Sequence, residues 1–264
     1  MSDRRLVQIR QGRMAMSTWG AGEPLVLLHP LATAGELWAP VAEVLADRYQ
    51  VFAPDLRGHG GTSWDRDGFT IQDMADDLRQ ALDTLSIGSV HLLGMSMGGS
   101  VAMTFAGLHP DRVRSLVLAD TTAWYGDKAP ATWADRADKA VSVPREKQVT
   151  FQVDRWFTDA FRDNNPEDVQ RVVDIFVATD SEAHAAACRA FGAMDVRKLL
   201  PAITAPTLVL VGEEDYATPP DMARQLHDTI PGATLRVLPA LRHMSLIELP
   251  ALAETVADHL AGAR

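Results

Sequence analysis

The chain has 264 residues, of which 47% are hydrophobic, and this is enough for one large globular domain or for one domain with an insertion. Its formal net charge is −10 at pH 7, with 35 acidic against 25 basic residues. This acidic balance argues against nucleic acid or an anionic membrane as the main partner, but it does not identify a substrate.

Cysteine content and the N-terminal sequence bear on the cellular compartment. Cys188 is the single cysteine, which excludes an internal disulfide, and its alanine-rich surroundings predict a buried position in a helix. The segment from Met1 to Arg5 is followed by alternating polar and apolar residues, unlike the apolar core of a signal peptide. No apolar run approaches the ~20 residues of a membrane span. We therefore expect a cytoplasmic protein with no membrane partner.

Short apolar segments recur along the chain and predict the strands of a sheet. The first element is an expected hairpin over residues 6–18, whose alternating stretches flank Gln11 and Gly12. Continuous apolar runs follow, as is typical of strands that are buried on both faces of a sheet. These runs cover residues 25–28, 51–53, 90–93, 116–118, 207–211 and 235–238.

Helical patterns lie between these strands. The clearest begins at Thr70, an expected N-cap with Asp73 at the third helical position, and its apolar residues repeat on one face up to Leu85. Strands that alternate with helices predict an α/β fold with a mostly parallel sheet and helices on both faces. The alternation stops where aromatic residues stand in polar, helix-like sequence. We therefore predict a core over residues 1–121 and 202–264, with a helical cap insertion over residues 122–201.

The segment from Gly94 to Gly98 has the G-x-S-x-G pattern of a nucleophile elbow, between an apolar strand and an apolar helix. Such a turn holds its serine in a strained backbone conformation that lifts the hydroxyl above the sheet, and side chains at both glycine positions would clash with it. The N-terminus of the following helix points at the site and favours developing negative charge. Ser96 is therefore the candidate nucleophile.

A serine hydroxyl needs a base that removes its proton, and the base needs an acid that orients it. With this elbow, the expected chain order is serine, acid, histidine. Asp215 follows a predicted strand and His243 lies in a loop after the last one, so both fall at the sheet edge where ligands bind. We expect His243 to act as general base and then as general acid, with Asp215 as its partner. Glu213, Glu214 and Asp120 remain alternatives for the acid.

Acyl transfer also requires an oxyanion hole, which is commonly built from two backbone N–H groups. Met97, directly after the candidate nucleophile, is expected to supply one of them. The loop after the strand at residues 25–28 is expected to supply the other from Leu31, since Pro30 has no N–H.

With these features, the chain resembles the α/β-hydrolase superfamily over essentially its whole length. The segments that carry the resemblance are the elbow, His29-Pro30-Leu31, Asp55 to Gly60, Gly212 to Asp215, and His243 with Glu248-Leu249-Pro250. The resemblance implies that the turn at residues 55–60 is structural and that His59 within it is a solvated turn residue.

Within that superfamily, the chain looks most like the 3-oxoadipate enol-lactonases. Besides the elbow, the likeness rests on Trp133-Ala134-Asp135-Arg136, Arg155-Trp156-Phe157-Thr158, Thr218-Pro219-Pro220 and the stretch from Ala186 to Arg197. One segment departs from the family pattern: these lactonases commonly carry a polar residue and then Ser-Leu-Gly where this chain has His29-Pro30-Leu31-Ala32. The departure bears on the substrate more than on the reaction class.

The resemblance implies hydrolysis of a small-molecule lactone or carboxylic ester through an acyl-enzyme on Ser96, with no metal and no organic cofactor. A carboxylated substrate would need a cation in the cap, for which Arg136 and Arg155 are candidates, with a solvated arginine as the alternative. Three tryptophans are candidates for the walls of an apolar pocket, with core packing as the alternative for each: Trp124, Trp133 and Trp156. A homo-oligomer is compatible with the sequence.

The same triad could also serve a general carboxylesterase, a carbon–carbon bond hydrolase, an acyltransferase or a perhydrolase, because pocket shape decides among them. A serine at position 96 disfavours dehalogenase and epoxide-hydrolase chemistry, which use an aspartate there. A weakly hydrolytic small-molecule receptor is the alternative from a different class of protein. The turnover number would distinguish a receptor from an enzyme.

Overall fold

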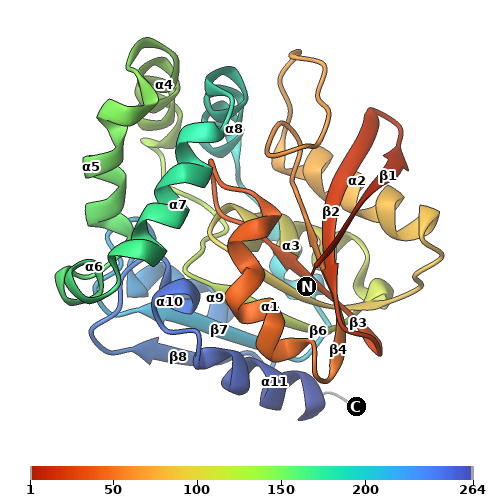
Figure 1. Ribbon diagram of the computed structural model, residues 1–264. Helices are drawn as coiled ribbons and strands as arrows, with labels where there is room; N and C mark the ends of the chain where they lie inside the picture. The colour runs from red at the N-terminus through yellow and green to blue at the C-terminus, as the bar shows by residue number, and fades with distance from the viewer. Residues whose placement is uncertain (1, 263–264) are drawn as a thin grey trace.

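The computed structural model describes residues 2–262, which form a central sheet with helices packed against it (Figure 1). This sheet has eight strands in the order β1-β2-β4-β3-β5-β6-β7-β8. The strands are β1 (Asp3–Ile9), β2 (Gly12–Trp19), β3 (Glu23–Leu28), β4 (Tyr49–Pro54), β5 (Val90–Met95), β6 (Val113–Ala119), β7 (Thr207–Gly212) and β8 (Thr234–Leu238). Every strand segment expected from the sequence lies within one of them or, for residues 6–18, within the β1–β2 hairpin.

Most of the sheet is parallel because helices connect its strands. In the part of the sheet that runs β4-β3-β5-β6-β7-β8, all neighbouring strands are parallel. By contrast, β2 pairs antiparallel with both β1 and β4. The hairpin turns tightly, with Ile9 paired to Gly12, whose φ of +127° is rarely adopted by a residue with a side chain. The carboxyl ends of the parallel strands share one edge of the sheet, and the expected catalytic loops begin there.

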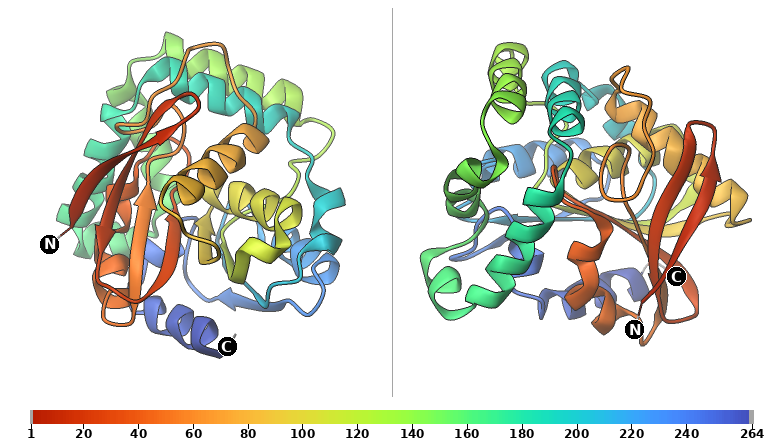
Figure 2. Two further views of the ribbon diagram at one scale, coloured as in Figure 1. Left: turned by 90° about the vertical axis from the view of Figure 1, so that its right-hand side faces the viewer. Right: turned by 45° about the horizontal axis from the view of Figure 1, so that its top comes forward.

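Helices cover both faces of the sheet, as the alternating pattern predicted. On one face, α1 packs with α10 and α11, and on the other face α2 packs with α3, near α9 (Figures 1 and 2). Their bounds are α1 (Ala39–Leu45), α2 (Ile71–Thr84), α3 (Met97–Leu108), α9 (Pro220–Thr229), α10 (Ser245–Glu248) and α11 (Leu252–Gly262). None of the helices within residues 2–262 is long and apolar enough to cross a membrane.

The start of α2 is fixed by a capping box, as expected from Thr70 and Asp73. The Thr70 hydroxyl accepts a hydrogen bond from the Asp73 N–H at 3.1 Å, and Asp73 Oδ2 accepts one from the Thr70 N–H at 2.8 Å. Two N–H groups that a helix start leaves without a partner are thereby satisfied. The apolar residues of α2 then face the core along one side, among them Met74 and Leu78.

Between β6 and β7, the chain leaves the sheet and forms a separate group of helices (Figure 1). These cap helices are α4 (Ala129–Ser142), α5 (Arg145–Trp156), α6 (Asp159–Asn164), α7 (Pro166–Ala178) and α8 (Ser181–Ala193). The strongest packing within the group is between α4 and α8, and Cys188 is buried in α8, as predicted. The helical insertion is thus confirmed, while its limits at residues 122 and 201 stay a prediction.

Candidate active site

Ser96 lies at the turn between β5 and α3, in a backbone conformation that residues with side chains rarely adopt. Its φ is +53° and its ψ is −116°. The turn is so tight that a Cβ atom on Gly94 would lie 2.2 Å from the Gly98 carbonyl oxygen, and one on Gly98 would lie 2.0 Å from the Leu28 carbonyl oxygen. Both positions therefore require glycine, for the reason that the G-x-S-x-G pattern indicated.

Side chains from three distant segments form one line of hydrogen bonds at this turn. His243 Nε2 lies 2.9 Å from Ser96 Oγ, and His243 Nδ1 lies 2.8 Å from Asp215 Oδ2. The second oxygen of Asp215 is held by its own loop, since it accepts from the Ala217 and Thr218 N–H groups at 2.7 and 2.9 Å. All three members of the line are buried. In this geometry, His243 can take the Ser96 proton while Asp215 stabilises the charged imidazole.

The two glutamates that could have been the acid point elsewhere. Both are exposed, although they lie within two residues of Asp215. Glu213 Oε2 accepts a hydrogen bond from the Ala240 N–H at 3.4 Å, and Glu214 Oε2 lies 3.6 Å from Arg242 Nε. Neither carboxylate is therefore placed to orient the imidazole.

Asp120 is buried beside the triad but serves a different set of partners. Its Oδ1 accepts a hydrogen bond from the Gly212 N–H at 3.0 Å. Its Oδ2 accepts from the Ser245 N–H at 3.0 Å and from the Ser245 hydroxyl at 2.7 Å. Asp120 thus ties the end of β6 to the end of β7 and to the loop that carries His243. This carboxylate positions the loop, whereas Asp215 contacts the imidazole.

Burial and charge act in opposite directions on the titratable groups of the site. Burial would lower the pKa of His243, but the charge of Asp215 and its hydrogen bond raise that pKa above the ordinary 6.5. Burial would raise the pKa of Asp215, but His243 and the Thr218 hydrogen bonds bring it below 3.8. Burial and the neighbouring Asp215 charge raise the pKa of Asp120 to about 7. Asp215 is therefore the ionised partner of the imidazole at neutral pH.

Activity is expected to fall as the pH is lowered, because general-base catalysis requires the neutral form of His243. Since the pKa of His243 is raised above 6.5, the acidic limb of the kcat/KM profile should have its midpoint above pH 6.5. Steady-state kinetics with an uncharged ester from about pH 5 to about pH 9 measures this midpoint. Thermal melts over the same range are the control for acid unfolding. A flat profile, or a midpoint below the ordinary histidine pKa, would contradict a His243 base.

The proposed oxyanion donors, Leu31 and Met97, both belong to segments that meet at Ser96. Met97 is the first residue of α3, so its N–H has no acceptor within the helix. Leu31 lines the pocket together with Ser96. The neighbouring Ala32 N–H is already in use, because it donates to His59 Nε2 at 3.2 Å. These contacts favour Leu31 over Ala32, and the assignment of both donors stays a prediction.

The loop after β3 is supported by two buried histidines. His29 Nε2 accepts a hydrogen bond from the Leu56 N–H at 2.9 Å, and His59 accepts the one from Ala32 while its Nδ1 lies 2.9 Å from the Arg57 carbonyl oxygen. The expectation that His59 is a solvated turn residue is wrong, since it is 0% exposed. His59 is buried because the turn at residues 55–60 folds against the loop after β3. A contact between two separate loops cannot be predicted from a local sequence pattern.

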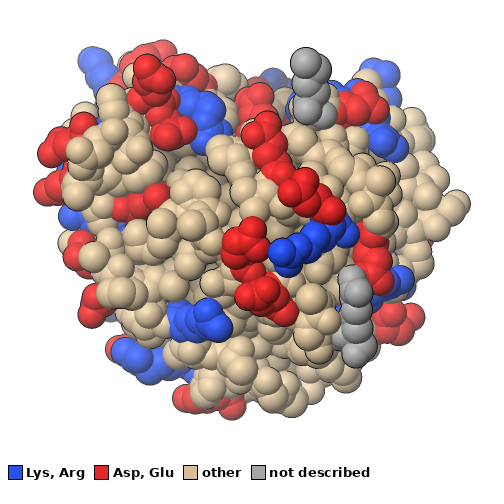
Figure 3. Space-filling model, turned by 60° about the horizontal axis from the view of Figure 1, so that its bottom comes forward, with Lys and Arg blue, Asp and Glu red and all other residues tan. Residues whose placement is uncertain are grey.

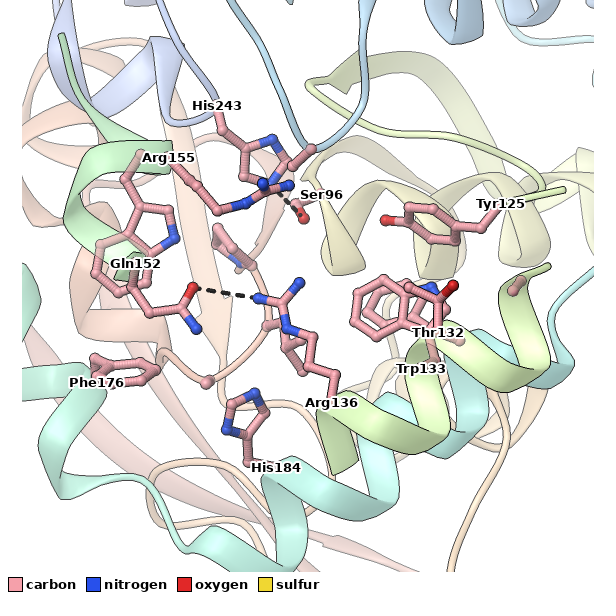
Figure 4. Close-up of a pocket in the computed structure, with 17 residues that line it drawn as sticks. Ser96, Tyr125, Thr132, Trp133, Arg136, Gln152, Arg155, Phe176, His184 and His243 are labelled. Atoms are coloured by element: carbon pink, nitrogen blue, oxygen red, sulfur yellow. Dashed lines mark hydrogen bonds between the residues drawn. The ribbon is translucent and has the colours of Figure 1, made fainter. Parts of the chain in front are cut away.

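A pocket opens beside Ser96 and is walled mainly by the cap helices (Figure 4). Four of the five cap residues expected to contact substrate line it: Trp133, Arg136, Arg155 and Trp156. The expectation for Trp124 is wrong, because its ring lies 3.7 Å from the Arg197 guanidinium carbon and its backbone pairs with Asp195. The next residue, Tyr125, lines the pocket in its place.

Several further lining residues were not anticipated, namely Thr132, Gln152, Phe176, His184 and Phe191. Helical spacing could have found two of them, because Thr132 and Gln152 each lie four residues before a predicted pocket residue, Arg136 and Trp156. Phe191 stacks on Trp133 with a centroid distance of 4.7 Å, which makes one wall aromatic. His184 stands in an alanine-rich helix, and no feature of its local sequence marked it.

Known proteins resemble this chain in sequence and in fold. Residues 23–250 match the family described as the alpha/beta hydrolase fold. The chain is 31% identical over 230 residues to 3-oxoadipate enol-lactonase 2 of Acinetobacter baylyi, which covers 86% of this chain and 84% of that protein. The structure is similar to the enol-lactonase of Burkholderia xenovorans LB400, with a TM-score of 0.92 and 31% identity over 97% of this chain and 100% of that one. It is also similar to a thermophilic esterase from Thermogutta terrifontis, with a TM-score of 0.89 and 28% identity over 100% of this chain and 99% of that one. The chain therefore belongs to the α/β-hydrolase family.

Proposed function

We propose that this α/β-hydrolase is a serine hydrolase that cleaves a carboxylic ester or lactone, and that its substrate is an enol-lactone of the 3-oxoadipate type. The observation that carries the proposal is the line of hydrogen bonds from Ser96 through His243 to Asp215 at the wall of a pocket. The similarity to two enol-lactonases over most of the chain supports the choice of substrate.

The first half of the reaction acylates Ser96. Its hydroxyl attacks the carbonyl carbon as His243 Nε2 takes the proton, and the carbonyl oxygen becomes an oxyanion. The Leu31 and Met97 N–H groups bind this oxygen and stabilise the tetrahedral intermediate. When the intermediate collapses, His243 gives the proton to the leaving oxygen. In a lactone, that oxygen stays attached to the acyl chain, so the whole molecule remains in the pocket as an ester of Ser96.

The second half of the reaction releases the product. A water molecule attacks the acyl carbon while His243 takes one of its protons, and the same proton then returns to the Ser96 oxygen as the acyl group leaves. The product is a carboxylic acid that also carries the former ring oxygen as an enol. Because an enol converts to the more stable ketone, hydrolysis of an enol-lactone is effectively irreversible.

A general carboxylesterase is the second candidate. The similarity to the thermophilic esterase extends over the whole of this chain. The loop His29-Pro30-Leu31-Ala32 also lacks the Ser-Leu-Gly that the resemblance associates with enol-lactonases. The two candidates share the triad and differ in what the pocket accepts.

Loss of 3-oxoadipate enol-lactone, followed by its ultraviolet absorbance, tests the proposed substrate. We expect sustained turnover of about 10 per second or more with the wild type and no catalysed loss with Ser96→Ala. If the lactone is lost slowly with both proteins while the wild type hydrolyses 4-nitrophenyl butyrate rapidly, the carboxylesterase is the correct candidate. A few turnovers at most on every substrate would contradict an enzyme and favour a receptor.

A further inference from the structure

The cap helix α5 ends against the loop after β8. A helix leaves its last carbonyl groups without a partner in its own backbone. At the end of α5, the Trp156 carbonyl oxygen accepts a hydrogen bond from the Met244 N–H at 3.1 Å. The carbonyl oxygens of Asp154 and Phe157 accept hydrogen bonds from Arg242 Nη1 at 3.0 and 2.8 Å. Two residues of the loop therefore complete the C-terminus of a helix that belongs to the cap.

Arg242 differs from the arginines that form ion pairs at the surface. On the face shown in Figure 3, basic side chains lie among acidic ones, and exposed pairs of this kind contribute little to the free energy of unfolding. The Arg242 side chain is only 14% exposed, although its carboxylate partner at 3.1 Å, Asp159, is itself exposed. Its charged donors are also well placed at a helix C-terminus, where the carbonyl groups carry partial negative charge. The contacts with the two carbonyl oxygens therefore fix this side chain more than the ion pair does.

The same guanidinium also lies against the loop that carries the acid. Its central carbon is 5.4 Å from the ring centroid of Tyr216, which directly follows Asp215. The Tyr216 carbonyl oxygen accepts a hydrogen bond from Arg155 Nη2 at 3.1 Å. Arg155 belongs to α5 and lines the pocket near His243 (Figure 4). Arg242 thus lies where the loops of the acid and of the base meet the end of a cap helix.

The turn after α5 is held to the same part of the chain by Glu248. This residue is 8% exposed, and its carboxylate accepts hydrogen bonds from the Thr158 N–H, at 3.2 Å, and from the Thr158 hydroxyl. From Arg242 to Glu248, the chain is therefore joined to the end of α5 and to the turn after it by one backbone N–H and two side chains.

We propose that Arg242 is a positioning residue, which anchors the His243 loop to the end of α5 and thereby holds the imidazole in the triad. His243 lies between two residues that are both bonded to α5, so its backbone is fixed from the cap. The inference rests on the proposed hydrolase function and gives the cap a role besides lining the pocket. Its docking keeps the general base within reach of Ser96 Oγ, at 2.9 Å, and of Asp215 Oδ2, at 2.8 Å.

Arg242→Met tests the proposal, because it removes the donors and keeps an apolar side chain against the loop. With 4-nitrophenyl butyrate, kcat should fall about 10- to 100-fold, since a displacement of the base by about 1 Å is enough for a loss of this size. Arg242→Lys keeps the charge and an N–H donor and should restore part of kcat.

The acidic midpoint of the kcat/KM profile separates positioning from stability. Asp215, Asp120 and Arg155 are the charged groups that act on the pKa of His243, and all three remain in Arg242→Met. An imidazole that moves away from Asp215 loses the interactions that raise its pKa above 6.5, so the midpoint should fall. Removal of a nearby positive charge would by itself raise this pKa, so a lower midpoint identifies movement of the imidazole.

Arg112 provides the matched control. Its side chain is 20% exposed and, like that of Arg242, donates to two backbone carbonyl oxygens and one carboxylate. These acceptors are Ile87 at 3.0 Å, Gly88, and Asp83 Oδ1 at 2.9 Å. Arg112 precedes β6, at the edge of the sheet opposite to the active site. Arg112→Met should therefore lower the melting temperature but leave kcat and the midpoint unchanged.

The proposal is overturned if the midpoint stays the same or rises in Arg242→Met, whatever happens to kcat, or if Arg112→Met shifts it equally. Circular dichroism melts identify a misfolded variant, and Arg242→Gln then replaces Arg242→Met with the same expected results. If the wild type hydrolyses neither 4-nitrophenyl butyrate nor the lactone, the proposed function fails, and an NMR titration of the His243 ring hydrogens decides on the positioning role alone. A His243 pKa that is lower in Arg242→Met supports the role, whereas an unchanged or higher pKa overturns it.

Discussion

Replacement of Ser96 by alanine is expected to abolish nearly all ester and lactone hydrolysis while the protein keeps its fold. The hydroxyl is the only group of the residue that the mechanism uses, and without it no acyl-enzyme can form. We expect kcat to fall about 10⁶-fold, to the rate that binding and the oxyanion hole alone support. The backbone of the elbow should be retained, because hydrogen bonds from the Ser96 N–H to the Ala119 carbonyl and from the Thr121 hydroxyl to the Ser96 carbonyl hold it.

Ser100, one turn further along α3, provides the matched control. It is also buried, and its hydroxyl donates to the Thr122 carbonyl oxygen at 3.0 Å and not to the triad. Ser100→Ala should therefore lose about 1 kcal/mol of the free energy of unfolding and keep its activity. Activity measured with 4-nitrophenyl butyrate and thermal melts separates the two effects. A well-folded Ser96→Ala protein that retained wild-type rates would remove Ser96 from the mechanism.

Asp215→Asn is expected to lower kcat about 10⁴-fold. An asparagine carbonyl in this position would still accept the Nδ1–H of His243 but would not stabilise the imidazolium. An asparagine NH₂ would donate to Nδ1 and leave the hydrogen on Nε2, which then could not take the Ser96 proton. The pKa of His243 should also fall, because the Asp215 charge that raises it is gone. Both effects are measured together in a kcat/KM profile against pH.

Asp120→Asn tests whether Asp215, and not Asp120, is the acid that acts on His243. In either orientation the amide would place its NH₂ group against a backbone N–H, that of Gly212 or that of Ser245, so the loop that carries His243 should loosen and the melting temperature should fall. We expect a smaller loss of kcat than in Asp215→Asn, because the partner of the imidazole is retained. If Asp120→Asn were the more damaging of the two, the assignment of the acid to Asp215 would be wrong.

The sheet and the turn at Ser96 could be predicted because each depends on local sequence. A strand buried on both faces reads as a continuous apolar run, and the elbow requires glycine at fixed distances from Ser96. Asp215 and His243 could be located because loops after parallel strands open on one edge of the sheet. His59 could not be placed in this way, since its burial depends on the fit between two loops, which the Ala32–His59 hydrogen bond joins across 27 residues of the chain.

The pocket was less predictable than the triad because helices in the cap pack on several neighbours at once. The prediction that Trp124 lines the pocket missed by one position in the sequence. Tyr125 lines the pocket, and Trp124 stacks against Arg197. His184, which lines the pocket, contacts Arg145 from another helix, 39 residues away along the chain. Such pairings follow from how the cap helices dock, and the hydrophobic pattern of any one helix does not encode them.

The distance of 147 residues along the chain between Ser96 and His243 has a consequence for synthesis. Domains form from the N-terminus onward as the chain leaves the ribosome, so the elbow emerges well before its base. Until β8 and the loop after it are made, Ser96 lacks the proton acceptor that the proposed mechanism requires. A chain that ends before His243 is therefore expected to be inert in the proposed hydrolysis.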